Sequence, residues 1–588
     1  MTAGRLAIAL LGGLLLGRTA LAADTIGAAE FSADHWTGGP IANTAFIPGK
    51  NARPAHEPFT GALTIGETEM STVPVTFKSG SVLDKNTRLF PAVAISFFTE
   101  NGDLVPVTQD IIRAGSLPGT HSFWDIIVQP GRVWSLPQDG GWSRAAFPFA
   151  LMNSIEGETH NGLATFLYKG GQVSKLRFQI VQQTAPFYVT DHFSAAGLAP
   201  LAFAPGSVDP LAEAAYKASL NDAIPIGDWR SLEQRVGKAA LEGFDGDMNP
   251  AEIVLSGLDY QGTFYLKGCN SAAGPLPWCD RARFGVWSAT KSLATATALL
   301  RLAQKYGPDV FDLKIKDYVP AAAAAPEWQA VRFGDAIDMA TGVGTGSDRQ
   351  DPNKIFDGYT DTHYAAWYEA QSVAEKVAAV IATGRPYPWG PGKVARYRDQ
   401  DMFILGVAMD AYLKSKAGPA ADIWTMLEDE VYRPIGIHYA PINRTIEPDG
   451  RRGHPLMAFG YYPTIGDMVK IARLYQARGE YRGEQLLYRP RIDALMYGPA
   501  PRGRPTGDSN RFGGTTYFNA FWHVPYQSPE GCKLYLPHMQ GFGGNLVAPM
   551  PGGTTGIRLA NANDEVEAAA DDPIGMAIVA NRLVRFCD

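Results

Sequence analysis

The chain changes its residue pattern near residue 195, and this change most constrains its fold. Residues 23–194 hold short β-rich runs separated by Gly and Pro, such as 92–98, 125–128 and 176–181. This regular spacing predicts an all-β, sandwich-like domain. The Ala- and Pro-rich stretch 195–210 predicts a linker. Because 588 residues exceed the roughly 250–300 at which one core stops growing, more than one core is expected.

Residues 211–588 predict a mixed α/β (α+β) domain. Helix signals at the start are followed by a predicted strand pair around 252–267, and helices and loops then alternate over a long stretch. Predicted strands return at 534–559, and an amphipathic helix closes the chain at 572–586. A strand pair, a large helical insert, further strands and a final helix describe a sheet with helices inserted between its strands.

Ser288 and Lys291 stand at the start of an Ala-, Leu- and Thr-rich stretch that predicts a helix. Residues three apart share a helix face, so the hydroxyl and the amine can meet. Serine needs an adjacent base to become a nucleophile, and lysine serves as one only when its pKa is lowered. Unpaired N–H groups at a helix start can also hold an oxyanion. The simpler reading is an N-cap serine followed by a solvated lysine.

Two further elements follow in the chain. Tyr397 comes after a Pro- and Gly-rich loop, 387–392, and precedes an apolar helical stretch. Residues 537–545 form a glycine-rich strand edge, where another part of the chain can approach closely.

In this order the three elements resemble those of the penicillin-recognising serine hydrolases. The branch in question contains class C β-lactamases, D-amino-acid peptidases, related esterases and 6-aminohexanoate-dimer hydrolases. Ser288 and Lys291 match its Ser-x-x-Lys, Tyr397 matches the tyrosine of its Tyr-x-Asn, and Gly541 matches the glycine of its strand motif. The resemblance covers about residues 210–588 and leaves the N-terminal region unexplained.

The resemblance implies a serine β-lactamase-like fold and an acyl-enzyme on Ser288. It also implies an oxyanion hole built from the backbone amides of Ser288 and Phe542. This chemistry needs no metal and no organic cofactor.

Asp399 departs from the family pattern, which has Asn at this position. An ionised Asp399 would favour the charged form of Lys291 and oppose its use as a base. Arg396 or Arg398 is expected to compensate by pairing with Asp399. Our hypothesis is that Tyr397 then carries more of the proton transfer, while a charged Lys291 lowers the tyrosine's pKa.

The third element reads Met539-Gln540-Gly541 if Gly541 makes the close approach. Relatives that act on β-lactams or D-Ala-D-Ala peptides have a cation at the first position, which Met539 cannot supply. His538 would point to the opposite face of the strand. The alternative register, led by His538, puts Gln540 where a glycine is needed. The departure favours a neutral or differently anchored ester or amide over a β-lactam.

The N-terminus predicts export. Arg5, the apolar core 6–16 and the small residues 20–22 form a secretory signal, predicted to end at residue 22. Its apolar core is too short for a membrane span, so a periplasmic protein without stable membrane insertion is expected.

Four cysteines suit an oxidising compartment. Cys269 and Cys279 would close a short loop, which leaves Cys532 with Cys587, although four cysteines allow three pairings.

Other site readings are weaker. A net charge of -7 excludes a basic footprint for nucleic acid. Glu156, Glu158 and His160 could bind a metal, but a solvated turn is the favoured reading. The stretch 245–256 resembles a calcium loop, but the required Gly and Glu are absent.

These observations favour a serine hydrolase acting on a small-molecule or peptide-like substrate, with a peptidase or amidase ahead of an esterase. The alternative is a binding or sensing protein without turnover, and a β-lactamase is a distant third. Oligomeric state and the role of the N-terminal region are left open. Aromatic candidates for the pocket wall are Trp367, Tyr368, Trp389 and the stretch 517–522.

Overall fold

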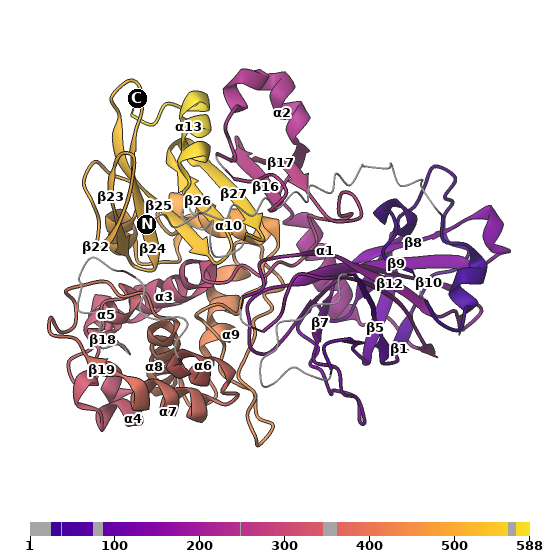
Figure 1. Cartoon of the computed structure of the whole chain (residues 1–588), viewed down its shortest axis with the longest axis horizontal. Coiled ribbons are helices and arrows are strands. Elements are labelled where there is room, and N and C mark those ends of the chain that lie inside the picture. Colours follow the sequence, from indigo (N-terminus) through magenta and orange to yellow (C-terminus); the bar gives the residue numbers. More distant parts are fainter. Residues whose placement is uncertain are drawn as a thin grey trace, which may run out of the picture.

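The computed structural model describes residues 25–562 and 572–587, apart from 37, 74–85, 188, 247, 345–354 and 356–361. The predicted signal segment 1–22 and Asp247 of the rejected calcium loop lie outside the described residues. Two large sheets organise the chain, with the N-terminal sheet at the right of Figure 1 and the C-terminal sheet at its upper left. Helices of the insert gather below the C-terminal sheet. No described helix is long and apolar enough to cross a membrane.

The N-terminal region forms one 12-stranded antiparallel sheet with the main order β14-β1-β5-β6-β8-β9-β10-β12-β13-β3. Its strands are β1 (Gly61–Ile65), β3 (Ser71–Val73), β5 (Val93–Glu100), β6 (Asp103–Pro106), β7 (Asp125–Val128), β8 (Gly131–Ser135), β9 (Ser143–Met152), β10 (His160–Lys169), β11 (Gln172–Val173), β12 (Leu176–Gln183), β13 (Ser194–Ala199) and β14 (Leu201–Pro205). The short strands β2 (Thr68–Glu69) and β4 (Leu89–Phe90) pair separately.

One face of this large sheet curls around a hydrophobic core of its own. The ring of Phe59, just before β1, lies 5.3 Å from that of Phe166 and 5.2 Å from that of Tyr168, both on β10. The region is β-rich as expected, but its strands form one continuous sheet instead of the two sheets of a sandwich.

The predicted linker is wrong for most of its length, because residues 195–199 lie in β13 and residues 201–205 lie in β14. Their small side chains serve packing. A Cβ added to Gly197 would lie 2.3 Å from the ring of Phe178 on the neighbouring β12. The Ala- and Gly-rich composition thus permits close contact with aromatic rings. Only a short connection separates β14 from α1 (Pro210–Asn221), which Asp209 caps.

The C-terminal region contains a nine-stranded sheet in the order β15-β17-β16-β27-β26-β25-β24-β23-β22. Its strands are β15 (Ile226–Asp228), β16 (Ile253–Tyr260), β17 (Thr263–Cys269), β22 (Arg504–Asn510), β23 (Gly513–Phe518), β24 (Phe521–Gln527), β25 (Lys533–Gly541), β26 (Asn545–Met550) and β27 (Thr554–Ala560). β15 pairs in parallel with β17, and the other neighbours are antiparallel. The strand pair before the insert therefore joins the strands after it, as the sequence predicts.

Helices cover both faces of this sheet. The insert and its surroundings hold α3 (Thr297–Tyr306), α4 (Pro320–Ala323), α5 (Phe333–Ile337), α6 (Thr362–Glu369), α7 (Val373–Thr383), α8 (Asp399–Ala417), α9 (Ile423–Leu427), α10 (Ile465–Gln476) and α11 (Arg489–Leu495). On the opposite face, α2 (Trp229–Val236) packs against β17, and α13 (Ile574–Leu583) packs against β26 and β27. In β26, Val547 packs on the side of the insert helices, and Leu546 packs on the side of α2 and α13. The two residues face opposite sides of the sheet because successive strand residues alternate.

The disulfides join Cys269 to Cys279 and Cys532 to Cys587, which confirms the expected pairing. Both lie in the C-terminal region.

Candidate active site

Ser288 lies in the turn that enters the predicted helix. Trp287, directly before it, has a φ of 47°, a left-handed conformation that is uncommon for a bulky residue. Lys291 begins a π-helical turn, Lys291–Ala296, which continues into α3. The helix brings Lys291 Nζ within 2.6 Å of Ser288 Oγ. The predicted meeting of the two side chains is therefore present.

Lys291 is almost fully buried, with 1% of its surface exposed. Its Nζ forms an ion pair with Asp399 and lies 2.9 Å from the carbonyl oxygen of Ala458. Burial lowers the pKa of Lys291 below its ordinary value, and Asp399 opposes this shift without reversing it. The simpler reading of a solvated lysine is wrong.

The partners of Lys291 constrain where its protons can point. A carboxylate and a carbonyl only accept hydrogen bonds, whereas a hydroxyl can also donate. A neutral amine would give its two N–H groups to Asp399 and Ala458 and turn its lone pair toward Ser288 Oγ. This is the arrangement that a general base for Ser288 requires.

Tyr397 lies beside Lys291 at the end of the loop before α8. Its ring centroid is 4.8 Å from Lys291 Nζ, within the range of a cation–π contact. Trp522 stacks on the ring of Tyr397 at 5.6 Å, and Tyr517 meets it edge-on at 5.8 Å. The aromatic stretch suggested for the pocket wall thus holds Tyr397 in place.

The other suggested aromatic residues have different surroundings. Trp389 stacks on Tyr387, and Trp367 and Tyr368 are buried in the core.

Asp399 begins α8 and pairs with Lys291. The expected pairing of Arg396 or Arg398 with Asp399 stays a prediction. Arg398 donates to the carbonyl of Val343 at 2.7 Å and pairs with Asp401, whereas Arg396 lies over the rings of Tyr387 and Trp389.

The end of β25 closely approaches the turn that carries Ser288, here called the nucleophile turn. A Cβ on Gly541 would lie 2.0 Å from the carbonyl oxygen of Val286 and 3.2 Å from the backbone nitrogen of Ala289. Only glycine fits here without a shift, which supports the register Met539-Gln540-Gly541. Phe542 follows Gly541, and its ring lies 5.5 Å from that of Trp287, which directly precedes Ser288. The oxyanion hole of Ser288 and Phe542 stays a prediction.

This strand supplies no cation at the expected position. Met539 is fully buried in the core. His538 lies on the other face, 3.4 Å from the half-buried Gln540, and burial lowers its pKa to about 3. At neutral pH the imidazole is uncharged.

The prediction of a solvated turn at Glu156, Glu158 and His160 is wrong, because all three side chains are fully buried and His160 begins β10. The segment before Ser288 covers them: Gly285 N–H donates to Thr159 Oγ1 at 3.0 Å. Among the described residues, no group of three or more His, Cys, Asp or Glu side chains is placed to hold a metal ion.

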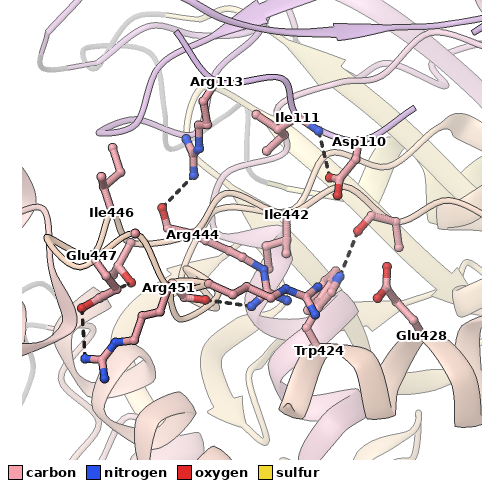
Figure 2. Close-up of a pocket in the computed structure, with 15 residues that line it drawn as sticks. Asp110, Ile111, Arg113, Trp424, Glu428, Ile442, Arg444, Ile446, Glu447 and Arg451 are labelled. Atoms are coloured by element: carbon pink, nitrogen blue, oxygen red, sulfur yellow. Dashed lines mark hydrogen bonds and ion pairs between the residues drawn. The ribbon is translucent and has the colours of Figure 1, made fainter. Parts of the chain in front are cut away.

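A separate cavity of about 340 Å³ lies between the N-terminal region and the loop 440–453. Figure 2 shows Arg113 reaching across to the carbonyl oxygen of Arg444, at 2.8 Å. Arg444 is itself paired with Asp422. None of the predicted catalytic residues is among those that line this cavity.

A model of the Beta-lactamase family matches residues 253–586, more than half of the chain. The chain therefore belongs to this family of serine hydrolases, as the three motifs predict. No curated protein gives a significant sequence match.

Several solved structures are similar to part of the chain. A D-stereospecific amidohydrolase from Streptomyces sp. is 14% identical, with a TM-score of 0.37, over 59% of this chain and 98% of that one. A penicillin-binding protein homologue from Caulobacter crescentus is 13% identical, with a TM-score of 0.38, over 61% and 97%. A class C β-lactamase is 13% identical, with a TM-score of 0.38, over 63% and 96%.

Proposed function

We propose that the protein is an exported serine hydrolase that cleaves an amide or ester bond in a small peptide-like substrate. The observation that carries this proposal is the position of Lys291 Nζ, 2.6 Å from Ser288 Oγ and held by Asp399 and Ala458. A buried lysine with a lowered pKa, aimed at a serine, is an activated nucleophile pair.

In the proposed reaction, Ser288 Oγ attacks the substrate carbonyl carbon while its proton moves to Lys291 Nζ. The negative charge on the carbonyl oxygen is held by the N–H groups of Ser288 and Phe542. Collapse of the tetrahedral intermediate breaks the bond to the leaving group, which takes the proton, and leaves an ester on Ser288. Water then attacks the carbonyl carbon of this ester and gives a proton to Lys291 Nζ. The bond to Ser288 Oγ breaks, the carboxylic acid leaves, and the proton returns from Lys291 to Ser288 Oγ.

We assign the serine proton to Lys291 in this reaction. Lys291 Nζ is within hydrogen-bond distance of Ser288 Oγ. The Tyr397 ring faces the amine, where a cation–π contact would stabilise the ammonium formed during the reaction.

The substrate class follows from the missing cation at the third element. Met539 is buried and His538 is uncharged at neutral pH, so neither would hold a substrate carboxylate. This favours a peptidase or amidase for neutral substrates, with an esterase close behind and a β-lactamase distant. Export is supported by the two disulfides, which suit an oxidising compartment.

The second candidate function is a binding or sensing protein without turnover. The observation in its favour is the ion pair between Lys291 and Asp399, which stabilises the ammonium form of Lys291. A lysine that stayed charged would not accept the serine proton.

A fluorophosphonate probe separates the two candidates. We expect wild-type protein to be labelled, Ser288→Ala to lose labelling, and Ser509→Ala, on the exposed part of β22, to keep it. No labelling of the wild type would favour the binding protein. Labelling that persists in Ser288→Ala would refute Ser288 as the nucleophile. Ester, peptide and β-lactam panels would then define the substrate.

A further inference from the structure

Three aromatic rings from distant parts of the chain meet beside Ser288. Trp287 directly precedes the serine, Phe542 directly follows Gly541, and Phe187 comes from the N-terminal region after β12. The Phe187 ring lies 4.8 Å from that of Phe542 and 6.1 Å from that of Trp287. Trp287 and Phe542 are 5.5 Å apart. All three contacts are edge-on, the geometry that aromatic pairs prefer.

The N-terminal segment that carries Phe187 is fixed to both turns of the proposed site. The carbonyl oxygen of Ala185 accepts the indole N–H of Trp287 at 2.8 Å. On the other side, a Cβ on Gly543 would lie 2.0 Å from the Ala185 Cβ. Gly543 has a φ of 78°, so this position needs glycine for both conformation and space.

A buried carboxylate anchors the chain just beyond Phe187. Glu156 accepts the N–H groups of Val189 at 2.7 Å and Thr190 at 3.2 Å. Because the segment is held on both sides, the position of the Phe187 ring is determined by the fold.

Phe187 and Phe542 differ from Trp287 in exposure. Trp287 is 4% exposed, and its buried ring packs against the rings of the other two residues. Phe187 and Phe542 are only half-buried, so they leave apolar surface open to a ligand. The Phe542 N–H is a proposed oxyanion donor, and a substrate carbonyl held there would bring its acyl group near these two rings.

We propose that the N-terminal region is part of the active site and that Phe187 is a specificity-determining residue. Phe187 and Phe542 form an apolar wall that binds the acyl group of the substrate, so that carbonyl compounds with aromatic or longer aliphatic acyl groups are preferred. This inference rests on the proposed function at Ser288. Apolar burial would supply the binding energy that a cation supplies elsewhere in the family.

The test uses a series of phosphonofluoridate probes with methyl, butyl and benzyl groups on phosphorus. Each probe phosphonylates a reactive serine and loses fluoride, so the rate of labelling needs no knowledge of the natural substrate. We expect the wild type to react at least about tenfold faster with the benzyl than with the methyl probe, since apolar pocket contacts discriminate by roughly 10- to 200-fold.

In Phe187→Ala the benzyl-to-methyl ratio should fall about tenfold. Phe187→Leu should restore most of the ratio. Phe203→Ala, a half-buried phenylalanine on the edge strand β14, should leave it unchanged.

Each outcome has a separate meaning. A wild type labelled by no probe refutes the proposed function. A labelled wild type without a benzyl preference, or an unchanged ratio in Phe187→Ala and Phe187→Leu, refutes the apolar wall alone. If the methyl, butyl and benzyl rates fall equally in Phe187→Ala, and Phe187→Leu restores none of them, the role of Phe187 is purely structural. This result also overturns the proposal.

Discussion

Replacing Asp399 by Asn tests which group takes the proton from Ser288. The change removes the carboxylate that contacts Lys291, keeps the side-chain size, and restores the amide found in relatives. Two unit charges 4 Å apart interact by about 4 kcal/mol at an effective dielectric constant of 20. Because one pKa unit corresponds to about 1.4 kcal/mol, the pKa of Lys291 can change by at most roughly three units when the carboxylate is removed. Relaxation of the surrounding structure makes a change of about one to three units the expected range.

The direction follows from the charges. Asp399 raises the pKa of Lys291, so its removal lowers that pKa further. A lysine base must be neutral to act. The acidic limb of kcat/KM, which reports the free enzyme, should therefore move to lower pH by about one to three units in Asp399→Asn.

If Tyr397 were the base, it would depend on the charge of Lys291 to lower its pKa. Because Asp399→Asn favours the uncharged form of Lys291, the pKa of Tyr397 would then rise and the acidic limb would move to higher pH. The assay is hydrolysis of a small ester from about pH 4 to about pH 10. Asp449→Asn, at an exposed carboxylate, is the control. An unshifted limb would show that Asp399 is not coupled to the base, and an upward shift would refute Lys291 as the base.

Two further predictions concern the frame of the site. Gly541→Ala would place a Cβ 2.0 Å from the carbonyl oxygen of Val286, so we expect kcat/KM to fall at least about 100-fold. Gly514→Ala, whose Cβ would meet its nearest neighbour at 3.8 Å, should have little effect, and equal activities would contradict the close approach. Burial raises the pKa of Glu158 from 4.5 to about 7, so its stabilising contribution is full below pH 4.5 and is lost as the pH rises through 7. Relative to Glu158→Gln, the wild type should lose up to about 3 kcal/mol of unfolding free energy between about pH 5 and about pH 9, and melting curves that shift in parallel would contradict this.

Much of the candidate site could be predicted from local sequence. Ser288 and Lys291 meet because a helix brings residues three apart onto one face. The glycine at 541 indicated a close approach, and the structure identifies the nucleophile turn as what approaches it. Short separation also made the pairing of Cys269 with Cys279 predictable.

The surroundings of several segments could not be predicted, because the residues that these segments contact are distant in the chain. The loop with Glu156 and Glu158 looked solvated, since its covering residues lie far along the sequence; Asn153, for example, accepts a hydrogen bond from Asn443. The small residues of 195–205 looked like a linker, since the pattern does not show the aromatic rings of β12 that they pack against.

By itself the sequence determined the family, the order of the three motifs and the helix that joins Ser288 to Lys291. These depend on residue identity and on the short-range periodicity of the backbone. The tertiary structure alone decided that Glu156 and Glu158 are buried and that Phe187 lies beside Phe542. Such contacts arise when the burial of apolar surface brings distant segments together, and no local pattern records which segment will be the neighbour.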